Sequence, residues 1–174
     1  MTSLFGQSLT EELMKLRIAT REEIRGCDLR EIEKLKERQD IKWLPQIYLD
    51  YLLTVGKQAG SLDVGTDCFY PVLLNLKEWA TTLLEENGMP FSLPADAFVF
   101  WMHQGYQFAY FLTGDKVDDP PVFYYTEDPE DTEEKPQTRH KHLSEFLTLF
   151  IADSVNKEAQ KSFLKKHGVI SDDD

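Results

Sequence analysis

The chain has 174 residues, of which 41% are hydrophobic and 29% charged, and its formal net charge is −12. This length and composition predict one globular domain with a substantial core, and they argue against wholesale disorder. The negative charge argues against a nucleic-acid partner, because binding to phosphates requires clustered Lys and Arg. It favours a protein partner with a basic face.

The cysteine content and the start of the chain indicate the compartment. Cys27 and Cys68 are too few for a disulfide framework, and neither has a metal-binding spacing. Met1 is followed by polar residues and not by the apolar segment of a secretory signal. We therefore expect a reduced, cytoplasmic protein without a membrane segment.

The first half of the chain has apolar residues at helical spacing. Asp28, with Glu31 three residues later, forms a capping-box pattern that predicts the start of a helix. Leu29, Ile32 and Leu35 follow as the expected buried face of that helix.

Two more helices are expected before the middle of the chain. One follows Pro45 and ends at Gly56, for which the pattern predicts a left-handed conformation. The other covers residues 71–87 and ends at Gly88. A glycine-containing connector separates the two helices.

Residues 97–114 contain no charged side chain but seven of the 21 aromatic residues of the chain. Their length reaches the lower limit for a transmembrane helix, but His103, Gln104, Gly105 and Gln107 interrupt the middle, and the aromatic residues are scattered instead of gathered at two interfaces. Gln104-Gly105 can instead turn a β-hairpin. The stretch is therefore interpreted as a hairpin and not as a membrane span.

The two-residue turn also predicts which side chains share a face. Val99, Trp101 and His103 are expected to lie on one face with Tyr106, Phe108 and Tyr110. The other face is also apolar, which is typical of central strands in a core. An aromatic-lined groove is the alternative, because Tyr and Trp combine apolar area with a polar group.

The rest of the chain completes the expected fold. "PVFYYTE" and "QTRHK" are predicted strands, and apolar residues from Leu143 to Val155 predict a last helix. Helices followed by consecutive strands and a helix describe an α+β fold. We expect a single domain over residues 1–174, with an antiparallel sheet of about four to six strands packed against several helices.

No motif in the sequence predicts catalysis. His140 and His142 alternate and could share a strand face as metal ligands, but no third ligand stands at a suitable spacing. The chain has no nucleotide-binding loop, metalloprotease motif or nucleophile elbow. We therefore expect no enzymatic activity, no metal and no cofactor.

The negative charge is concentrated in one segment and at the end of the chain. Nine acids and two lysines lie between Gly114 and Pro136, a net charge of −7. Residues 127–136 are predicted to form a mobile acidic loop, and residues 171–174 an acidic tail. Both features fit either simple solubility or a docking surface.

Four segments together resemble the SUKH superfamily, which includes bacterial toxin-immunity proteins and a fungal cell-wall assembly regulator. They are "LREIEKLKERQDIKWLPQIYLDYLL", "FVFWMHQGYQFAYFL", "DDPPVFYY" and "LSEFLTLFI", within residues 22–151. Family members often have Asn-Gly-Gly after the helix that begins "LPxxY". This chain has "TVGKQAG" there, a departure from the family pattern.

The resemblance implies a non-catalytic domain that binds and neutralises a cognate toxin, for which a nuclease with a basic face is one candidate. The alternative is a regulatory scaffold of the same fold that binds an endogenous partner. The partner-binding residues that we expect are acids around the acidic segment and two aromatic residues of the hairpin. They are Asp118, Asp119, Glu127, Asp128, Glu130, Asp131, Glu133, Glu134, Trp101 and Tyr106.

Overall fold

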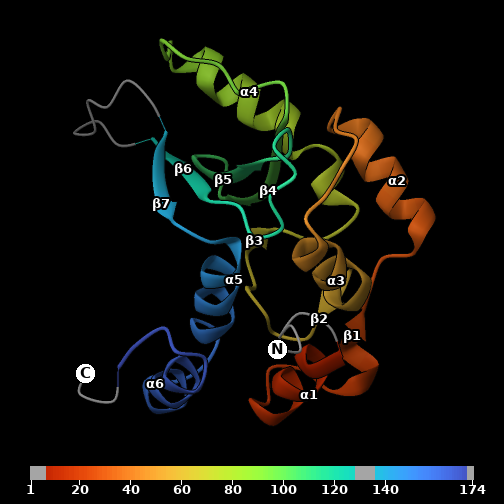
Figure 1. Ribbon diagram of the computed structural model, residues 1–174, viewed down its shortest axis with the longest axis vertical. Helices are drawn as coiled ribbons and strands as arrows, with labels where there is room; N and C mark the ends of the chain where they lie inside the picture. Colours follow the sequence, from red (N-terminus) through yellow and green to blue (C-terminus); the bar gives the residue numbers. More distant parts are fainter. Residues whose placement is uncertain (1–6, 128–135, 172–174) are drawn as a thin grey trace.

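The computed structural model describes residues 7–127 and 136–171, which form two antiparallel sheets and surrounding helices (Figure 1). The described helices are α1 (Gln7–Lys15), η1 (Arg21–Glu23), α2 (Leu29–Arg38), α3 (Gln46–Val55), η2 (Val72–Leu74), α4 (Leu76–Glu86), α5 (Leu143–Ala152) and α6 (Lys157–Lys166). The described strands are β1 (Ile24–Arg25), β2 (Gln58–Ala59), β3 (Thr66–Asp67), β4 (Ala97–His103), β5 (Gln107–Leu112), β6 (Val122–Thr126) and β7 (Gln137–His140). The expected α+β class and the single domain are confirmed, because one hydrophobic core joins these elements.

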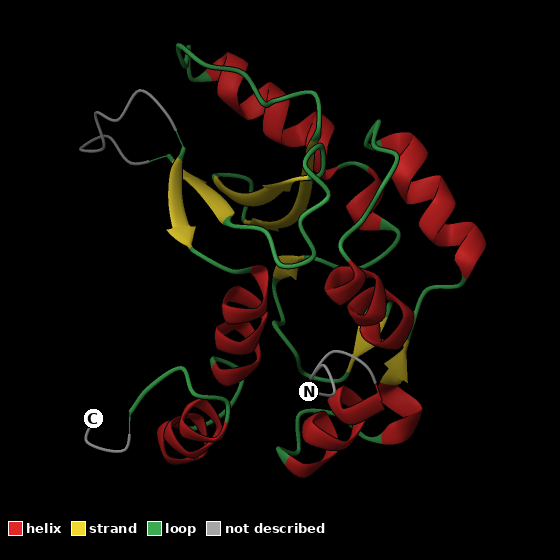
Figure 2. Cartoon of the chain, in the orientation of Figure 1, coloured by secondary structure: helices red, strands yellow, loops and turns green. Residues whose placement is uncertain are grey.

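The larger sheet has five strands in the order β3-β4-β5-β6-β7, and all neighbours are antiparallel. Each strand therefore pairs with its neighbours in sequence, as short connections favour. The smaller sheet pairs β1 with β2 near α1, away from the larger sheet (Figure 2). The predicted antiparallel sheet of about four to six strands is confirmed.

Helices cover both faces of the larger sheet. On one face, Tyr48 of α3 packs against Phe98 and Phe111, with ring centroids 5.4 Å away in each case. On the other face, Phe108 packs against Tyr125, whose hydroxyl accepts a hydrogen bond from Asn87 just after α4. Figure 1 shows α4 on one side of the sheet and α3 and α5 on the other. The hairpin therefore has an aromatic core on both faces, as its composition predicts.

A β-bulge at Phe100 changes which side chains face α5. Val99 pairs with Tyr110, but Trp101 pairs with Ala109, so Phe100 is an extra residue in β4. Phe100 and Trp101 both contact Phe146 of α5, at centroid distances of 5.0 and 6.3 Å. The bulge therefore turns two consecutive aromatic side chains toward the same helix.

The buried side chain of Gln39 pairs with β4 where β3 is too short to do so. The amide of Gln39, just after α2, donates from Nε2 to the Val99 carbonyl and accepts from the Val99 N–H, both at 2.8 Å. Nε2 also donates to the carbonyl of Leu73 in η2, again at 2.8 Å. Since a buried peptide group without a partner is costly, this amide takes the role of a neighbouring strand.

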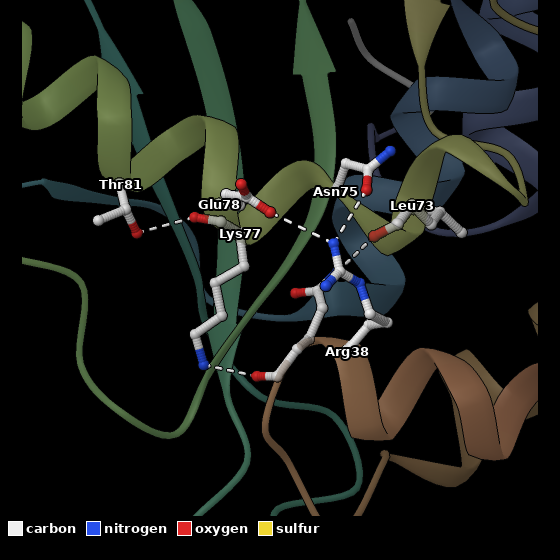
Figure 3. A network of polar contacts seen from close by, with 7 residues as sticks. Arg38, Leu73, Asn75, Lys77, Glu78 and Thr81 are labelled. Carbon is white, nitrogen blue, oxygen red and sulfur yellow. Dashed lines mark hydrogen bonds and ion pairs between the residues drawn. The ribbon is translucent and has the colours of Figure 1, made fainter.

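Polar contacts around Gln39 connect α2 to α4. Arg38 donates to Asn75 and to the Glu78 carboxylate, both at 3.3 Å (Figure 3). Lys77 donates to the main-chain carbonyls of Gln39 and Ala95, at 2.6 and 2.8 Å. Burial lowers the pKa of Lys77. The end of α2 is thus fixed against the helix that covers the sheet.

The capping box at the start of α2 is confirmed, but its buried face is only partly as predicted. The Asp28 carboxylate accepts from the Glu31 N–H, and the Glu31 carboxylate accepts from the Asp28 N–H. Ile32 and Leu35 are buried, whereas Leu29 is 68% exposed. The prediction for Leu29 is wrong because this first helical residue lies about 120° around the axis from Leu35.

Gly56 ends α3 without the predicted left-handed conformation. Its φ is −58°, and a Cβ there would lie only 2.5 Å from the Leu52 carbonyl oxygen and 2.7 Å from Cys27 Sγ. The glycine is therefore required by close packing. Gly88, with φ of +61°, does have the left-handed conformation that stops a helix.

Two predicted helices have different bounds in the structure. The helix predicted over residues 71–87 is divided into η2 and α4, which meet at Asn75. The last predicted helix, from Leu143 to Val155, ends at Ala152, and α6 follows it. Helix α6 was not predicted, because Phe163 and Leu164 are its only fully buried residues.

Within the described residues, no helix has both the length and the apolar character needed to cross a membrane.

Candidate functional site

The end of the larger sheet at the β4–β5 loop carries a continuous group of aromatic and polar side chains. We call this group the hairpin-end patch. Its residues come from the loop before β3, from β3 and from the four following strands with the β4–β5 loop, and all of them are at least partly exposed. They are Asp63, Thr66, Trp101, His103, Tyr106, Gln107, Tyr124 and Arg139.

The loop that closes the hairpin is longer than predicted. His103 pairs with Gln107, so the loop contains three residues, of which Gln104 and Gly105 have φ values of +49° and +77°. The predicted two-residue turn is wrong, and the extra loop residue shifts the register by one. Trp101 and His103 therefore lie opposite Ala109 and Gln107, and not opposite Phe108 and Tyr106 as predicted.

The bulge at Phe100 compensates for the longer loop. Beyond the bulge, Val99 pairs with Tyr110, which is the pairing that the two-residue turn predicts. The predicted register is therefore correct in the covered part of the hairpin and wrong at its exposed end. The extra residue in the loop and the extra residue in β4 shift the register only of the short segment between them, which contains Trp101 and His103.

Four rings form a row across this end of the sheet. Trp101 and His103 are stacked, with centroids 5.9 Å apart and an angle of 14° between the ring planes. Tyr106 meets His103 edge-on at 6.1 Å, and Tyr124 lies 5.9 Å from Trp101. Ala109 separates Trp101 from Tyr124 on the intervening strand, and its small side chain allows their approach.

Hydrogen bonds fix the orientation of three of these rings. Trp101 Nε1 donates to Asp63 Oδ2 at 3.2 Å, and Tyr124 donates to Gln107 Oε1 at 2.7 Å. His103 Nδ1 lies 3.0 Å from the Thr66 hydroxyl. Because these three rings have fixed partners, this part of the patch is organised before any ligand binds.

Asp63 is the half-buried carboxylate of the patch. It has a φ of +49° in a tight loop, and its N–H donates to Ser154 just after α5 at 3.4 Å. Burial raises the pKa of Asp63, although hydrogen bonds from Thr66 and Trp101 and the proximity of His103 oppose this. The carboxylate of Asp153 raises the pKa further. Asp63 therefore holds its negative charge in an unfavourable environment.

Arg139 provides the cation of the patch. Its guanidinium carbon lies 4.6 Å from the centroid of the Tyr124 ring, a cation–π contact. Burial raises the pKa of Tyr124, and the charge of Arg139 partly offsets this rise. This edge of the patch thus shows a guanidinium stacked on a ring.

His140 and His142 do not share a strand face. His140 lies in β7 with its Nδ1 3.7 Å from Glu145, whereas His142 precedes α5 with its Nδ1 3.8 Å from Asp119. Burial lowers the pKa of His140. Among residues 7–127 and 136–171, no group of three or more His, Cys, Asp and Glu side chains is arranged to hold a metal ion.

The two cysteines are buried inside the core. Burial raises the pKa of Cys27 to about 12 and raises that of Cys68 well above its usual range. Cys68 lines a cavity of about 10 Å³ beneath Trp101 and Phe146, which has room for no more than a water molecule. Both thiols thus stay protonated. Because the cavity beneath Trp101 is so small, the patch presents a surface and not a deep pocket.

The structure brings together some of the predicted binding residues. Trp101 and Tyr106 meet through His103, and the Glu127 N–H donates to the Tyr106 carbonyl at 2.9 Å. Asp118 and Asp119 lie in the β5–β6 connection, at the opposite end of the sheet. The other predicted acids lie outside the described residues: Asp128, Glu130, Asp131, Glu133 and Glu134.

Asp119 has a role within the fold. Its carboxylate accepts hydrogen bonds from the Ser144 N–H at 2.8 Å and from the Ser144 hydroxyl at 2.6 Å. Asp119 thereby fixes the first turn of α5, whereas Asp118 is exposed.

Sequence reasoning predicted Trp101 and Tyr106 and missed the other members of the patch, which are Asp63, Thr66, His103, Gln107, Tyr124 and Arg139. Asp63-Val64-Gly65 is a recognisable turn signal, and Gly65 indeed has a φ of +94°. The turn signal could not show that the Asp63 carboxylate reaches Trp101, 38 residues later in the chain. The sequence matches no protein-family model, and no curated protein is significantly similar to it.

Proposed function

We propose that this chain is a non-catalytic protein-binding domain and that the hairpin-end patch is its contact surface. The observation that carries the proposal is the row of partly exposed rings formed by Trp101, His103 and Tyr106, in which hydrogen bonds hold Trp101 and His103. Trp, Tyr and Arg dominate the binding energy of protein interfaces, and rings that are already fixed lose little entropy on binding. The patch combines all three residue types.

The charge of the chain supports a partner with a basic face. The net charge is −12, and Glu127 lies next to Tyr106 at the edge of the patch. The acids from Asp128 to Glu134 follow Glu127 directly in the sequence. Such a charge distribution speeds the encounter with a basic surface.

The specific role that we propose is neutralisation of a cognate toxin in the cytoplasm. Its support is the resemblance of four segments to the SUKH superfamily, together with the acidic character of the chain. Toxins that cleave nucleic acid have basic active faces, so an acidic protein can occupy the place of the phosphates.

Co-expression with the product of the adjacent open reading frame tests this proposal. We expect that product to arrest growth alone and the present chain to restore growth. Trp101→Ala and Tyr106→Ala should each weaken binding to the purified toxin at least tenfold, because each removes a ring of the patch. Far-ultraviolet circular dichroism should show both variants folded.

Trp79→Ala is the matched control, because Trp79 is 42% exposed on α4, which covers the face of the sheet opposite to the patch. It should bind as tightly as the unmodified chain. A loss of binding for Trp79→Ala but not for Trp101→Ala would contradict the proposed surface. An adjacent product that is not toxic but binds through the patch would favour the regulatory scaffold.

The acidic segment should set the rate of association. Neutralising Asp128, Glu130, Asp131, Glu133 and Glu134 to Asn or Gln should slow association about tenfold at low salt and flatten its dependence on ionic strength. Stopped-flow mixing between low and physiological salt would measure this. Identical rates at every salt concentration would remove the steering role from the segment.

A further inference from the structure

The Asp63 carboxylate and the stacked rings of Trp101 and His103 lie side by side in the patch, and we call these three side chains the Asp63 site. The indole N–H of Trp101 and Asp63 Oδ2 are 3.2 Å apart, so the carboxylate and the ring system are in direct contact. Both side chains are partly exposed, as is His103. A ligand group that touches the indole is therefore also within reach of the carboxylate.

The charge of Asp63 is poorly compensated within the described part of the chain. There, no Lys or Arg forms an ion pair with it, and Asp153 nearby has the same sign. The imidazole of His103 lowers the pKa of Asp63, against the effects of burial and of Asp153. A ligand cation would supply the missing opposite charge.

The same row of rings already binds a guanidinium. Arg139 stacks on Tyr124. The Tyr124 ring is next to Trp101 in the row, with the two ring centroids 5.9 Å apart. The surface of the row therefore suits a planar cation. Trp is a better cation–π partner than Tyr, so the indole should hold a guanidinium at least as well.

We propose that the Asp63 site, formed by Asp63 and the Trp101–His103 ring pair, binds an arginine side chain of the protein partner. The guanidinium stacks on the rings and pairs with the Asp63 carboxylate. Arginine fits better than lysine because its planar group stacks and donates in a fixed fork, whereas an ammonium is compact and more strongly hydrated. This inference rests on the proposed function and names the side chain that the same site recognises.

Nuclear magnetic resonance with a small probe tests the Asp63 site without the natural partner. The probe is the blocked peptide acetyl-Gly-Arg-Gly-amide, titrated into the full chain. The chain has three tryptophans, so the indole N–H signals of Trp43 and Trp79 are internal controls for that of Trp101. We expect a saturable shift of the Trp101 signal, and little change in the other two signals.

Four comparisons decide the outcome. The lysine peptide should bind at least threefold more weakly, and the uncharged citrulline peptide at least tenfold more weakly. Asp63→Asn should weaken binding of the arginine peptide at least tenfold, because the amide keeps an acceptor for Trp101 but loses the charge. Asn also tolerates the positive φ of Asp63. Asp40→Asn is the matched control, because Asp40 is an exposed acid after α2 with a φ of +51°, and this variant should bind the peptide as the unmodified chain does.

Equal shifts at Trp79 and Trp101, equal binding of lysine, or unchanged binding to Asp63→Asn would overturn the inference. The failure of the proposed function would look different. If Trp101→Ala and Tyr106→Ala abolish partner binding while Asp63→Asn does not, the contact surface stands and arginine recognition fails. If the peptide binds as expected but the partner binds elsewhere, arginine binding at the Asp63 site is upheld and the proposed function fails.

Discussion

The two ends of the β4–β5 hairpin are built from the same residue types but have different environments. At the covered end, Phe98 and Phe111 are fully buried and pack against Tyr48 of α3. At the loop end, Trp101 and His103 are partly exposed and have polar partners, Asp63 and Thr66. An aromatic residue in a strand therefore does not by itself indicate core or contact surface. The two ends differ in how completely the rings are buried and in whether the rings have polar partners.

Phe98→Ala should give the largest effect on stability. Phe98 contacts Tyr48 and Phe111, so its removal leaves a cavity in the core and should lower the free energy of unfolding by about 3–5 kcal/mol. Trp101→Ala should cost about 1–2 kcal/mol, because Trp101 is partly exposed. Urea denaturation followed by circular dichroism would measure both. Equal costs would contradict the difference between the two ends.

Gln39→Leu should have the second-largest effect. The substitution conserves approximate size but leaves the N–H and the carbonyl of Val99 and the Leu73 carbonyl without the Gln39 amide. We expect a loss of about 2–4 kcal/mol in urea denaturation, because buried polar groups without partners are costly. Gln46→Leu on the exposed start of α3 is the control and should change stability by less than about 0.5 kcal/mol.

Asp63→Asn should have the smallest effect on stability, with a characteristic pH dependence. Burial raises the folded-state pKa of Asp63 above its unfolded value, so the protonated form is favoured by folding. The contribution of Asp63 to the free energy of unfolding is therefore fully present below the unfolded-state pKa of about 3.9, and it is lost as the pH rises through the folded-state pKa. Because Asp63 is half exposed, we expect a change below about 1 kcal/mol.

Urea denaturation of both chains at pH 4, 5.5 and 7 would measure the difference in their stability. The unmodified chain should gain stability relative to Asp63→Asn as the pH is lowered toward 4. At pH 7 the Asn variant should be at least as stable. A gain for the unmodified chain with rising pH would show that its carboxylate is stabilised and not strained in the fold.

Local patterns predicted much of the fold. The capping box at Asp28, the hairpin, β6 and β7 follow from residues close in sequence, and the structure confirms them. Helix α6 was not predicted because most of its residues are polar and Phe163 and Leu164 alone are fully buried. Its position depends on packing against α5, which no pattern within α6 indicates.

The candidate site was harder to predict because it depends on small differences in register. Trp101 and Tyr106 were predicted as contact residues, but the bulge at Phe100 and the three-residue loop decide which side chains surround them. Asp63 reaches the site from a loop 38 residues away in sequence. Neither the bulge nor this approach has a local signature, because both are set by packing between distant segments.

The Gln39 amide has a consequence for how this protein can associate with others. An unpaired strand edge exposes donors and acceptors that can add a strand from another molecule. On the β3 side of β4, the Val99 N–H and carbonyl already bond to Gln39, and α2 is held there by Arg38 and Lys77. That edge is therefore closed to strand addition at Val99. Association through the side chains of the hairpin-end patch can then take place without competing sheet extension at this position.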